Sequence, residues 1–208
     1  SPFIAANPKI YSMIYRSAEN YPKERWDYDL TIAAIKKLPK EQKKSLLEIG
    51  AGVGIFLKKI SNKLIKKDDL FASEISAIGK KELSRHGINN YSDFFSDKIS
   101  KKFSIICLFD TIEHLDSLDA LFKKIRKITE NDAYLFITTH VKPTLEFLET
   151  HSAGIDMPPV HISCWDQKSF EILKSRYGFK LVDRRTHRRN LLGRMLDFGL
   201  GTFHTRKL

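Results

Sequence analysis

Cysteine is scarce in this chain of 208 residues, which contains only Cys107 and Cys164. No CxxC pair occurs, so the sequence offers neither a cysteine zinc site nor the disulfide framework of a small secreted protein. Cys107 lies within an apolar run, and we expect it to be a buried small hydrophobic residue. Reduced, structural cysteines are typical of a cytoplasmic protein, which is the location we expect.

Long apolar runs are missing too. No stretch reaches the roughly 18 residues that a membrane-spanning helix needs, and no basic and apolar leader is visible at the start. Hydrophobic residues make up 42% of the chain and charged residues 29%, which is typical of a soluble globular protein. This length is enough for one domain with a substantial core.

Acidic residues are too few to balance the basic ones, and the net charge is +11. Near the end of the chain only Asp183 and Asp197 oppose nine basic residues: Arg176, Lys180, Arg184, Arg185, Arg188, Arg189, Arg194, Arg206 and Lys207. Such a cluster attracts phosphates or an anionic surface. A solvated, lysine-rich surface explains the charge equally simply, and both interpretations stay open.

Apolar runs alternate with helical patterns, which predicts a parallel α/β sheet. We expect strands over residues 45–49, 70–73, 89–91, 103–109, 133–138 and 179–183, and a last antiparallel strand near 194–200. We expect helices over 24–38, 55–64, 77–86, 118–128 and 167–177, the last one bounded by Asp166 and Gly178. This order predicts a doubly wound, Rossmann-like fold: a seven-stranded, mostly parallel sheet with helices on both faces.

The most informative stretch, residues 46–57, reads LLEIGAGVGIFL. An apolar run containing Glu48 is followed by glycines at every second position, Gly50, Gly52 and Gly54, and then by a helical pattern. The spacing predicts a strand, a tight loop and a helix N-terminus. Because glycine has no Cβ, the backbone N–H groups of such a loop can approach a ligand closely. The pattern indicates a nucleotide-like cofactor at the carboxyl end of the first strand.

Three further acidic positions follow the next strands. Glu74 ends the second strand, where a carboxylate can accept hydrogen bonds from both ribose hydroxyls. Asp93 and Phe94 follow the third strand, and their carboxylate and ring suit an adenine. The segment DTIEHL, residues 110–115, follows the fourth strand. Each feature is weak alone, and their order makes the pattern informative.

The motifs L-E-I-G-x-G-x-G and D-x-I-E-H-L together resemble the class I S-adenosylmethionine-dependent methyltransferases, over residues 46–182, and most closely their small-molecule (UbiE/UbiG-like) branch. The resemblance implies S-adenosylmethionine as cofactor. It assigns the methionine part and ribose edge to Glu48, Gly50, Ala51, Gly52 and Gly54, the ribose hydroxyls to Glu74, the adenine to Ile75, Asp93 and Phe94, and the floor near the methyl group to Asp110 and Thr111. It also implies that Glu113 and His114 open the following loop toward the substrate.

Binding of NAD is a competing interpretation. A dinucleotide loop needs G-x-G-x-x-G, whose third glycine permits close packing of helix and strand. Here Gly54 gives G-x-G-x-G and Ile55 follows it. Glu74 does not discriminate, because both classes use an acid at that position. The glycine spacing favours the methyltransferase.

Histidines supply the candidate catalytic groups. His114 belongs to DTIEHL, His140 follows the fifth strand, and His161 lies in PPVHISCW, which resembles a Pro-Pro-x-His…Trp segment of some bacterial methyltransferases. A general base contributes about 10²–10⁴ in rate, and a structural role stays open for each histidine, His151 included. His140, His151, Asp156 and His161 share one loop but match no zinc spacing, so we expect no metal.

We predict an enzyme that moves a methyl group to a small-molecule acceptor, such as a sugar, with O-methylation slightly favoured. No N/D-P-P-aromatic motif, which is typical of amino-group methylation of nucleic acid or protein, follows the fourth strand. Two alternatives stay open: an RNA-modifying methyltransferase that uses the basic C-terminal region, and a non-catalytic cofactor-binding module. The oligomeric state also stays open.

We interpret residues 1–208 as a single domain in four parts. Residues 1–44 form an N-terminal helical cap, and residues 45–189 form the cofactor-binding core. Within that core, residues 140–165 are a substrate-side loop. Residues 190–208 are a basic C-terminal segment.

Overall fold

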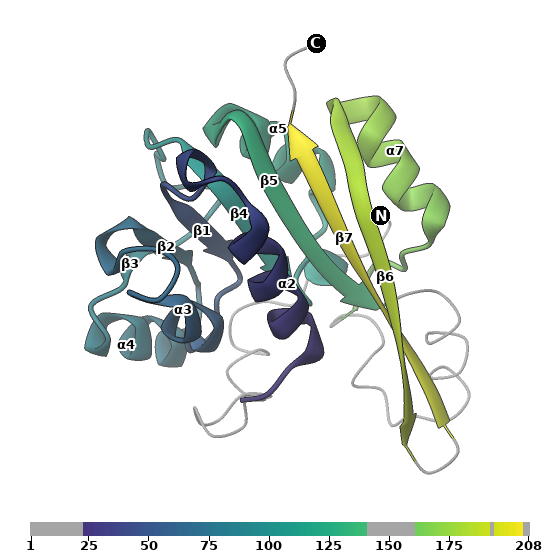
Figure 1. Ribbon diagram of the computed structural model, residues 1–208, viewed down its shortest axis with the longest axis horizontal. Coiled ribbons are helices and arrows are strands. Elements are labelled where there is room, and N and C mark those ends of the chain that lie inside the picture. The colour runs from purple at the N-terminus through teal and green to yellow at the C-terminus, as the bar shows by residue number, and fades with distance from the viewer. Residues whose placement is uncertain (1–22, 141–160, 192–193, 206–208) are drawn as a thin grey trace.

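The computed structural model describes residues 23–140, 161–191 and 194–205, with side chains described over 23–140 and 161–185. The strands form one sheet in the order β3-β2-β1-β4-β5-β7-β6 (Figure 1). Five strands are mutually parallel: β1 Leu46–Ile49, β2 Leu70–Ser73, β3 Asn89–Tyr91, β4 Phe103–Phe109 and β5 Thr129–His140. The predicted α/β class with a parallel sheet is confirmed.

Strand β1 lies between β2 and β4, and this position creates the site. From β1 the chain builds outward through β2 and β3, then crosses back to place β4 on the other side of β1. Every residue of β1 and β4 is buried, as expected for strands covered on both faces. Where strand order reverses in this way, the carboxyl ends of the strands leave a crevice for a ligand.

The last two strands are longer than the sequence predicts. β6 spans Phe179–Leu191 and β7 spans Arg194–Thr205, and they form the extended ribbon beside β5 in Figure 1. β7 is antiparallel to both β5 and β6, which confirms its predicted direction. The pairing runs from Phe179↔Thr205 to Leu191↔Arg194, so ladder hydrogen bonds extend the strands beyond their apolar residues. Polar residues that pair in this way do not produce an apolar pattern, so the hydropathy of the sequence does not predict the full length of these strands.

Helices cover both faces of the sheet. Helices α2 Trp26–Lys37, α3 Ile55–Ile60 and α4 Ala77–Arg85 contribute to one hydrophobic cluster, and α5 Leu118–Ile128 and α7 Gln167–Tyr177 contribute to the other. Alternate residues of β4 divide between them: Ile105 and Cys107 join the first cluster, and Ile106 and Leu108 join the second. Cys107 is fully buried, as predicted. No helix in the described ranges combines the length and the apolar character needed to cross a membrane.

Local chemistry sets the helix ends. The Asp166 side chain accepts from the N–H of Ser169 at 2.8 Å, and Gly178 takes φ 68° after the last turn, so both predicted boundaries of α7 are confirmed. Helix α3 ends at Ile60 and not at residue 64, because Asn62 takes a positive φ of 56° and Ser61 pairs with Ile65 in a short bridge.

Candidate active site

A tight loop over residues 50–54 connects β1 to α3 at the centre of the crevice. Gly50 and Gly52 take φ values of 74° and 53°, a region that glycine occupies without strain. At Gly50 space is limited as well, since an added Cβ would lie 2.5 Å from Oγ1 of Thr111. The loop backbone therefore packs directly against the segment that follows β4.

Glu74 joins the glycine loop to the start of α4. Its Oε2 accepts a hydrogen bond from the N–H of Gly52 at 2.7 Å, and its Oε1 accepts one from the N–H of Ser76 at 2.6 Å. Hydrogen bonds to an ionised acceptor are shorter and stronger than neutral ones. Glu74 is 8% exposed and lines a cavity at this edge of the sheet, so the predicted ribose-binding acid also holds the loop in shape.

Arg25, just before α2, lies between two carboxylates. Its guanidinium donates to Asp27 at 2.6 and 2.9 Å, and its Nη2 lies 2.7 Å from Oδ2 of Asp110. Burial lowers the pKa of Arg25, but Asp110 and Asp27 outweigh this effect and raise it overall, so the group stays charged. Asp110 takes a positive φ of 46°, which is uncommon for a residue other than glycine.

Glu48 is buried inside the fold, with 1% of its surface exposed. Burial is the main cause that raises its pKa well above the ordinary value; Arg25 opposes the shift, while Glu74 and Asp27 increase it. A high pKa favours the protonated carboxyl group in the folded protein. Glu48 does not line the cavity, so its predicted contact with the methionine part stays a prediction.

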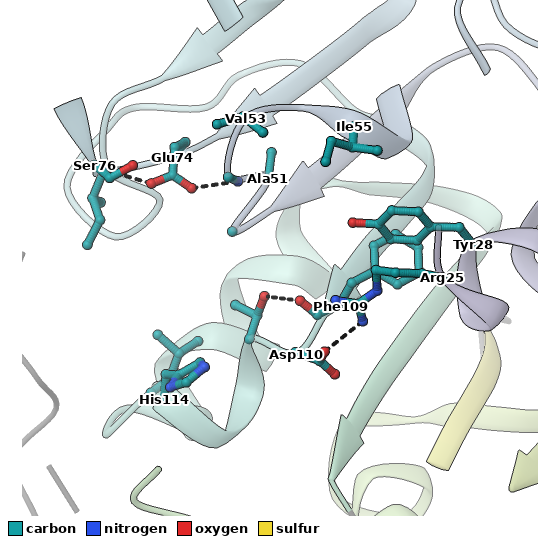
Figure 2. A pocket seen from close by; sticks show the side chains of 15 residues that line it. Arg25, Tyr28, Ala51, Val53, Ile55, Glu74, Ser76, Phe109, Asp110 and His114 are labelled. Atoms are coloured by element: carbon teal, nitrogen blue, oxygen red, sulfur yellow. Dashed lines mark hydrogen bonds and ion pairs between the residues drawn. The ribbon is translucent and has the colours of Figure 1, made fainter. Parts of the chain in front are cut away.

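A cavity of about 290 Å³ opens at the carboxyl ends of β1, β2 and β4. This is close to the lower end of the range for small-molecule sites, about 300–1,000 Å³. Figure 2 shows Glu74 and Ala51 across the cavity from Asp110 and His114. The lining consists of Arg25, Tyr28, Gly50, Ala51, Gly52, Val53, Ile55, Glu74, Ile75, Ser76, Phe109, Asp110, Thr111, His114 and Leu115. Eight predicted residues are thereby brought together: Gly50, Ala51, Gly52, Glu74, Ile75, Asp110, Thr111 and His114.

The three candidate catalytic histidines also meet, although they come from separate segments. His114 ends the short helix η4, Ile112–His114; His140 ends β5; and His161 precedes α7. The ring centroids of His114 and His161 are 4.6 Å apart, and those of His140 and His161 are 5.0 Å apart. Burial, together with the two neighbouring imidazoles, lowers the pKa of His161 to about 3, so it is neutral near pH 7. His151 lies outside the described residues.

Glu113 lies beside these histidines and is 1% exposed. Its Oε2 accepts a hydrogen bond from Oγ1 of Thr139 at 3.0 Å. Burial, followed by the charge of Asp110, raises its pKa well above the ordinary value. Glu113 is absent from the cavity lining, whereas His114 belongs to it, so the expectation that the two residues open the loop toward the substrate stays a prediction.

Two residues assigned to the adenine lie outside the cavity lining. The carboxylate of Asp93 accepts from the N–H of Phe95 and the hydroxyl of Ser96, both at 2.8 Å, and shapes its own turn. Phe94 is 4% exposed and belongs to the hydrophobic core, with Nζ of Lys124 5.2 Å from its ring centre. Their role at the adenine stays a prediction that the lining does not support.

Gly54 is also outside the lining, and its small size has a packing reason. An added Cβ there would lie 2.7 Å from a side-chain carbon of Leu83 in α4. Gly54 therefore lets α3 begin close to α4. This packing helps to position the glycine loop, although Gly54 itself does not line the cavity.

Arg25 and Tyr28 line the cavity, and neither is among the site residues that the sequence predicts. The guanidinium carbon of Arg25 lies 4.9 Å from the centre of the Tyr28 ring, which packs edge-on against Phe109 at 4.9 Å. The only signal in the sequence is a basic residue followed by Asp27 at a helix start. That pattern is common in helices. Arg25 and Asp110 are far apart in the sequence, so no motif predicts that they pair.

The geometry defines a class: an α/β protein whose glycine loop and acidic strand end meet at the switch point of a parallel sheet, as in proteins that bind a nucleotide-like cofactor. Residues 23–184 match a family model described as a methyltransferase domain. The chain belongs to this methyltransferase family. With this fold it is a class I methyltransferase that depends on S-adenosylmethionine.

Solved structures with the same fold share little sequence with this chain. N-methyltransferase NodS from Bradyrhizobium japonicum WM9 is 14% identical with a TM-score of 0.64, covering 89% of this chain and 100% of its own. Magnesium protoporphyrin IX methyltransferase (ChlM) from Synechocystis PCC 6803, with bound SAH, is 14% identical with a TM-score of 0.60, covering 86% and 81%. The [4+2]-cyclase SpnF is 13% identical with a TM-score of 0.71, covering 99% and 98%. A comparison with curated proteins returned no match.

Proposed function

We propose that this enzyme transfers a methyl group from S-adenosylmethionine to an oxygen atom of a small-molecule acceptor. The observation that carries the proposal is the carboxylate of Glu74, which the N–H of Gly52 holds at 2.7 Å on one side of the cavity. Asp110 and His114 lie on the opposite side of the same cavity (Figure 2). One side thus suits the ribose of a nucleoside, and the other side suits the acceptor.

The residues present fit this cofactor. Glu74 has lone pairs beyond its two backbone bonds, so it can also accept from ribose hydroxyls. Ile75 is 41% exposed at the cavity and offers an apolar surface to adenine. Arg25 and Asp110 carry opposite charges. Arg25 therefore suits the carboxylate of the methionine part, and Asp110 suits its amino group. The sulfonium supplies an activated methyl group, and the protein supplies binding and orientation.

The histidines favour oxygen as the methylated atom. A hydroxyl must lose its proton as it attacks, whereas a neutral amine can attack without a base. His114 lines the cavity, and His140 and His161 lie close behind it, so imidazole nitrogens converge on this side. The fold alone does not choose the atom, since NodS is an N-methyltransferase.

We extend the proposal to the chain as a whole. Strands β6 and β7 complete a seven-stranded, doubly wound sheet, and residues 1–208 act as one domain. We propose residues 140–165 as the acceptor side. Residues 141–160 of this segment lie outside the described residues, and His140 and His161, which bracket them, have ring centroids 5.0 Å apart.

Matched acceptors test the proposal. Calorimetry with S-adenosylhomocysteine checks the cofactor first, and purified protein that takes up none would overturn the cofactor assignment. Release of S-adenosylhomocysteine is then measured with pairs of sugars and phenols that carry either a hydroxyl or an amino group at the same position. We expect turnover with hydroxyl acceptors. Turnover confined to the amines, or to transfer RNA, would overturn the choice of a small-molecule oxygen acceptor.

A further inference from the structure

Carboxylates and imidazoles from three separate segments gather beside the cavity. Glu113 and His114 belong to η4, His140 ends β5, His161 precedes α7, and Asp110 follows β4. Two overlapping groups have ligand atoms within 4.8 Å of one another: one is Glu113, His114 and His161, and the other is Asp110, Glu113 and His140. Glu113 belongs to both groups and therefore lies at the centre of the cluster.

The carboxylate of Glu113 has an unused acceptor inside the protein. Its Oε2 accepts from Thr139, whereas its Oε1 is buried and has no hydrogen-bond partner within residues 23–140 and 161–185. A buried carboxylate oxygen without a donor is costly, and protein structures normally satisfy such atoms with a donor, a water or a cation. A carboxylate oxygen of Glu113 lies within 4.8 Å of the histidine nitrogens, and an imidazole nitrogen together with a carboxylate oxygen can bind one metal ion.

Backbone hydrogen bonds hold the segments of the cluster together. The carbonyl oxygen of Glu113 accepts from the N–H of Ile162 at 2.8 Å and from the N–H of Ser163 at 3.2 Å. The indole N–H of Trp165 donates to Oγ of Ser163 at 3.1 Å. The hydroxyl of Thr139, the residue before His140, fixes the carboxylate itself. Ligands whose orientation is set by such outer partners are typical of metal sites in proteins.

We propose that Glu113, His114 and His161 bind a divalent transition-metal ion, with His140 and Asp110 completing or supporting its coordination. Two nitrogens and one carboxylate oxygen suit Zn²⁺, Co²⁺ or Fe²⁺, whereas Mg²⁺ and Ca²⁺ prefer sites made of oxygen alone. Metal–ligand bonds of about 2.0–2.2 Å place the ligand atoms of a tetrahedral site about 3.3–3.6 Å apart. Small rotations of side chains already within 4.8 Å reach that spacing.

The site adjoins the place where the acceptor is expected. His114 and Asp110 line the cavity, so an ion held by His114 lies beside it. Resting on the proposed function, we infer that the acceptor binds the ion through its oxygen atoms, as vicinal hydroxyls or a hydroxyl next to a carbonyl can do. The ion would lower the pKa of the bound hydroxyl, so that its proton would pass to solvent water. The oxygen would then form its bond to the methyl carbon while the bond from that carbon to sulfur breaks and releases S-adenosylhomocysteine. In this arrangement His114 and His161 would serve as ligands and would not be the base.

Titration with Co²⁺ and Zn²⁺ tests the site without any methyl transfer. The full chain, stripped of metal, is titrated with Co²⁺ while its visible absorption is recorded, and Zn²⁺ is then used to displace the cobalt. We expect one equivalent to bind, and we expect E113Q and H161Q to weaken Zn²⁺ binding at least tenfold, since even outer-partner changes cost about 10–100-fold. H86Q is the matched control, because His86, the residue that follows α4, is 39% exposed and outside the cluster, and it should bind as the wild type does.

The outcomes separate this inference from the proposed function. Binding of S-adenosylhomocysteine without uptake of Zn²⁺ would overturn the metal site alone. Equal Zn²⁺ affinity in wild type, E113Q and H161Q would also overturn it, as would a preference for Mg²⁺. If H161Q does not fold, as judged by circular dichroism, H114Q replaces it, because His114 is partly exposed and its loss leaves a smaller void. Loss of Zn²⁺ binding in folded H114Q would support the site.

Discussion

Arg25 and Asp110 form an ion pair, with 2.7 Å between Nη2 and Oδ2, that ties the start of α2 to the end of β4. The same nitrogen lies 2.6 Å from Oδ2 of Asp27, so one guanidinium serves two carboxylates. The side chain of Asp27 is fully buried, and that of Asp110 is 25% exposed. The position of α2, and with it one wall of the cavity, therefore depends on a charge contributed by a residue just outside the helix.

Replacing Arg25 by Gln should destabilise the protein by about 2–4 kcal/mol, because it leaves the buried carboxylate of Asp27 and the partly exposed one of Asp110 without their cation. R25K should lie between R25Q and the wild type, since lysine keeps the charge but cannot donate in the planar two-pronged geometry. Urea unfolding measures both. R85Q is the control: Arg85 is 72% exposed and pairs with Glu82 on the helix surface, so its loss should cost less than about 0.5 kcal/mol. An equal loss in R25Q and R85Q would contradict the structural role of the pair.

E74Q should weaken binding of S-adenosylhomocysteine about 10–100-fold. The backbone N–H groups of Gly52 and Ser76 both point at the carboxylate, and a glutamine amide would turn its NH₂ group toward one of them. Loss of one hydrogen bond to a charged group costs about 1.5–3 kcal/mol. Calorimetry measures the affinity, with E41Q as control because Glu41 is exposed and lies outside the cavity lining. An affinity for E74Q within twofold of the wild type would contradict the ribose assignment.

The sequence predicts features whose causes are local. The loop of Gly50 and Gly52, the acid at Glu74 and the ends of α7 follow from residue types at short spacings, and the structure has them where expected. The full length of β6 was not predictable, because pairing with β7 extends it through polar residues.

Features built by distant residues were not predictable either. The pair of Arg25 with Asp110 joins segments that no motif connects. Likewise, the loop that begins at His140 has no zinc spacing along the sequence, whereas the structure brings Glu113, His114 and His161 together from separate elements. A motif describes the spacing of residues within one segment, so it does not predict contacts between segments that are distant in the sequence.

G50A should be destabilising and should also weaken cofactor binding. At φ 74° an alanine costs about 1–3 kcal/mol in backbone strain, and its Cβ would also lie 2.5 Å from Oγ1 of Thr111. Adding T111A should recover part of the loss by removing the clash, while the strain remains. Urea unfolding and calorimetry separate the two effects.

G87A is the matched control for G50A. Gly87 takes a similar φ of 62°, but an added Cβ there meets only the flexible end of Lys67, and neither residue lines the cavity. G87A should lose stability through strain alone and keep the wild-type affinity for S-adenosylhomocysteine. The account of Gly50 fails if G50A binds as tightly as G87A, or if T111A recovers nothing.

E48Q should gain stability relative to the wild type as the pH rises. The folded protein raises the pKa of Glu48 above its unfolded value, chiefly by burial, so the folded state holds a proton that the unfolded state has already released. Above the unfolded pKa of about 4.3 this difference costs the wild type stability, increasingly up to the folded pKa. Glutamine has no proton to lose, so the melting temperature of E48Q minus that of the wild type should be larger at pH 8 than at pH 5. The exposed substitution E41Q should show the same difference at both pH values. A gap for E48Q that stays constant or narrows toward pH 8 would mean that Glu48 is ionised in the folded protein, held by Arg25 more strongly than burial opposes it.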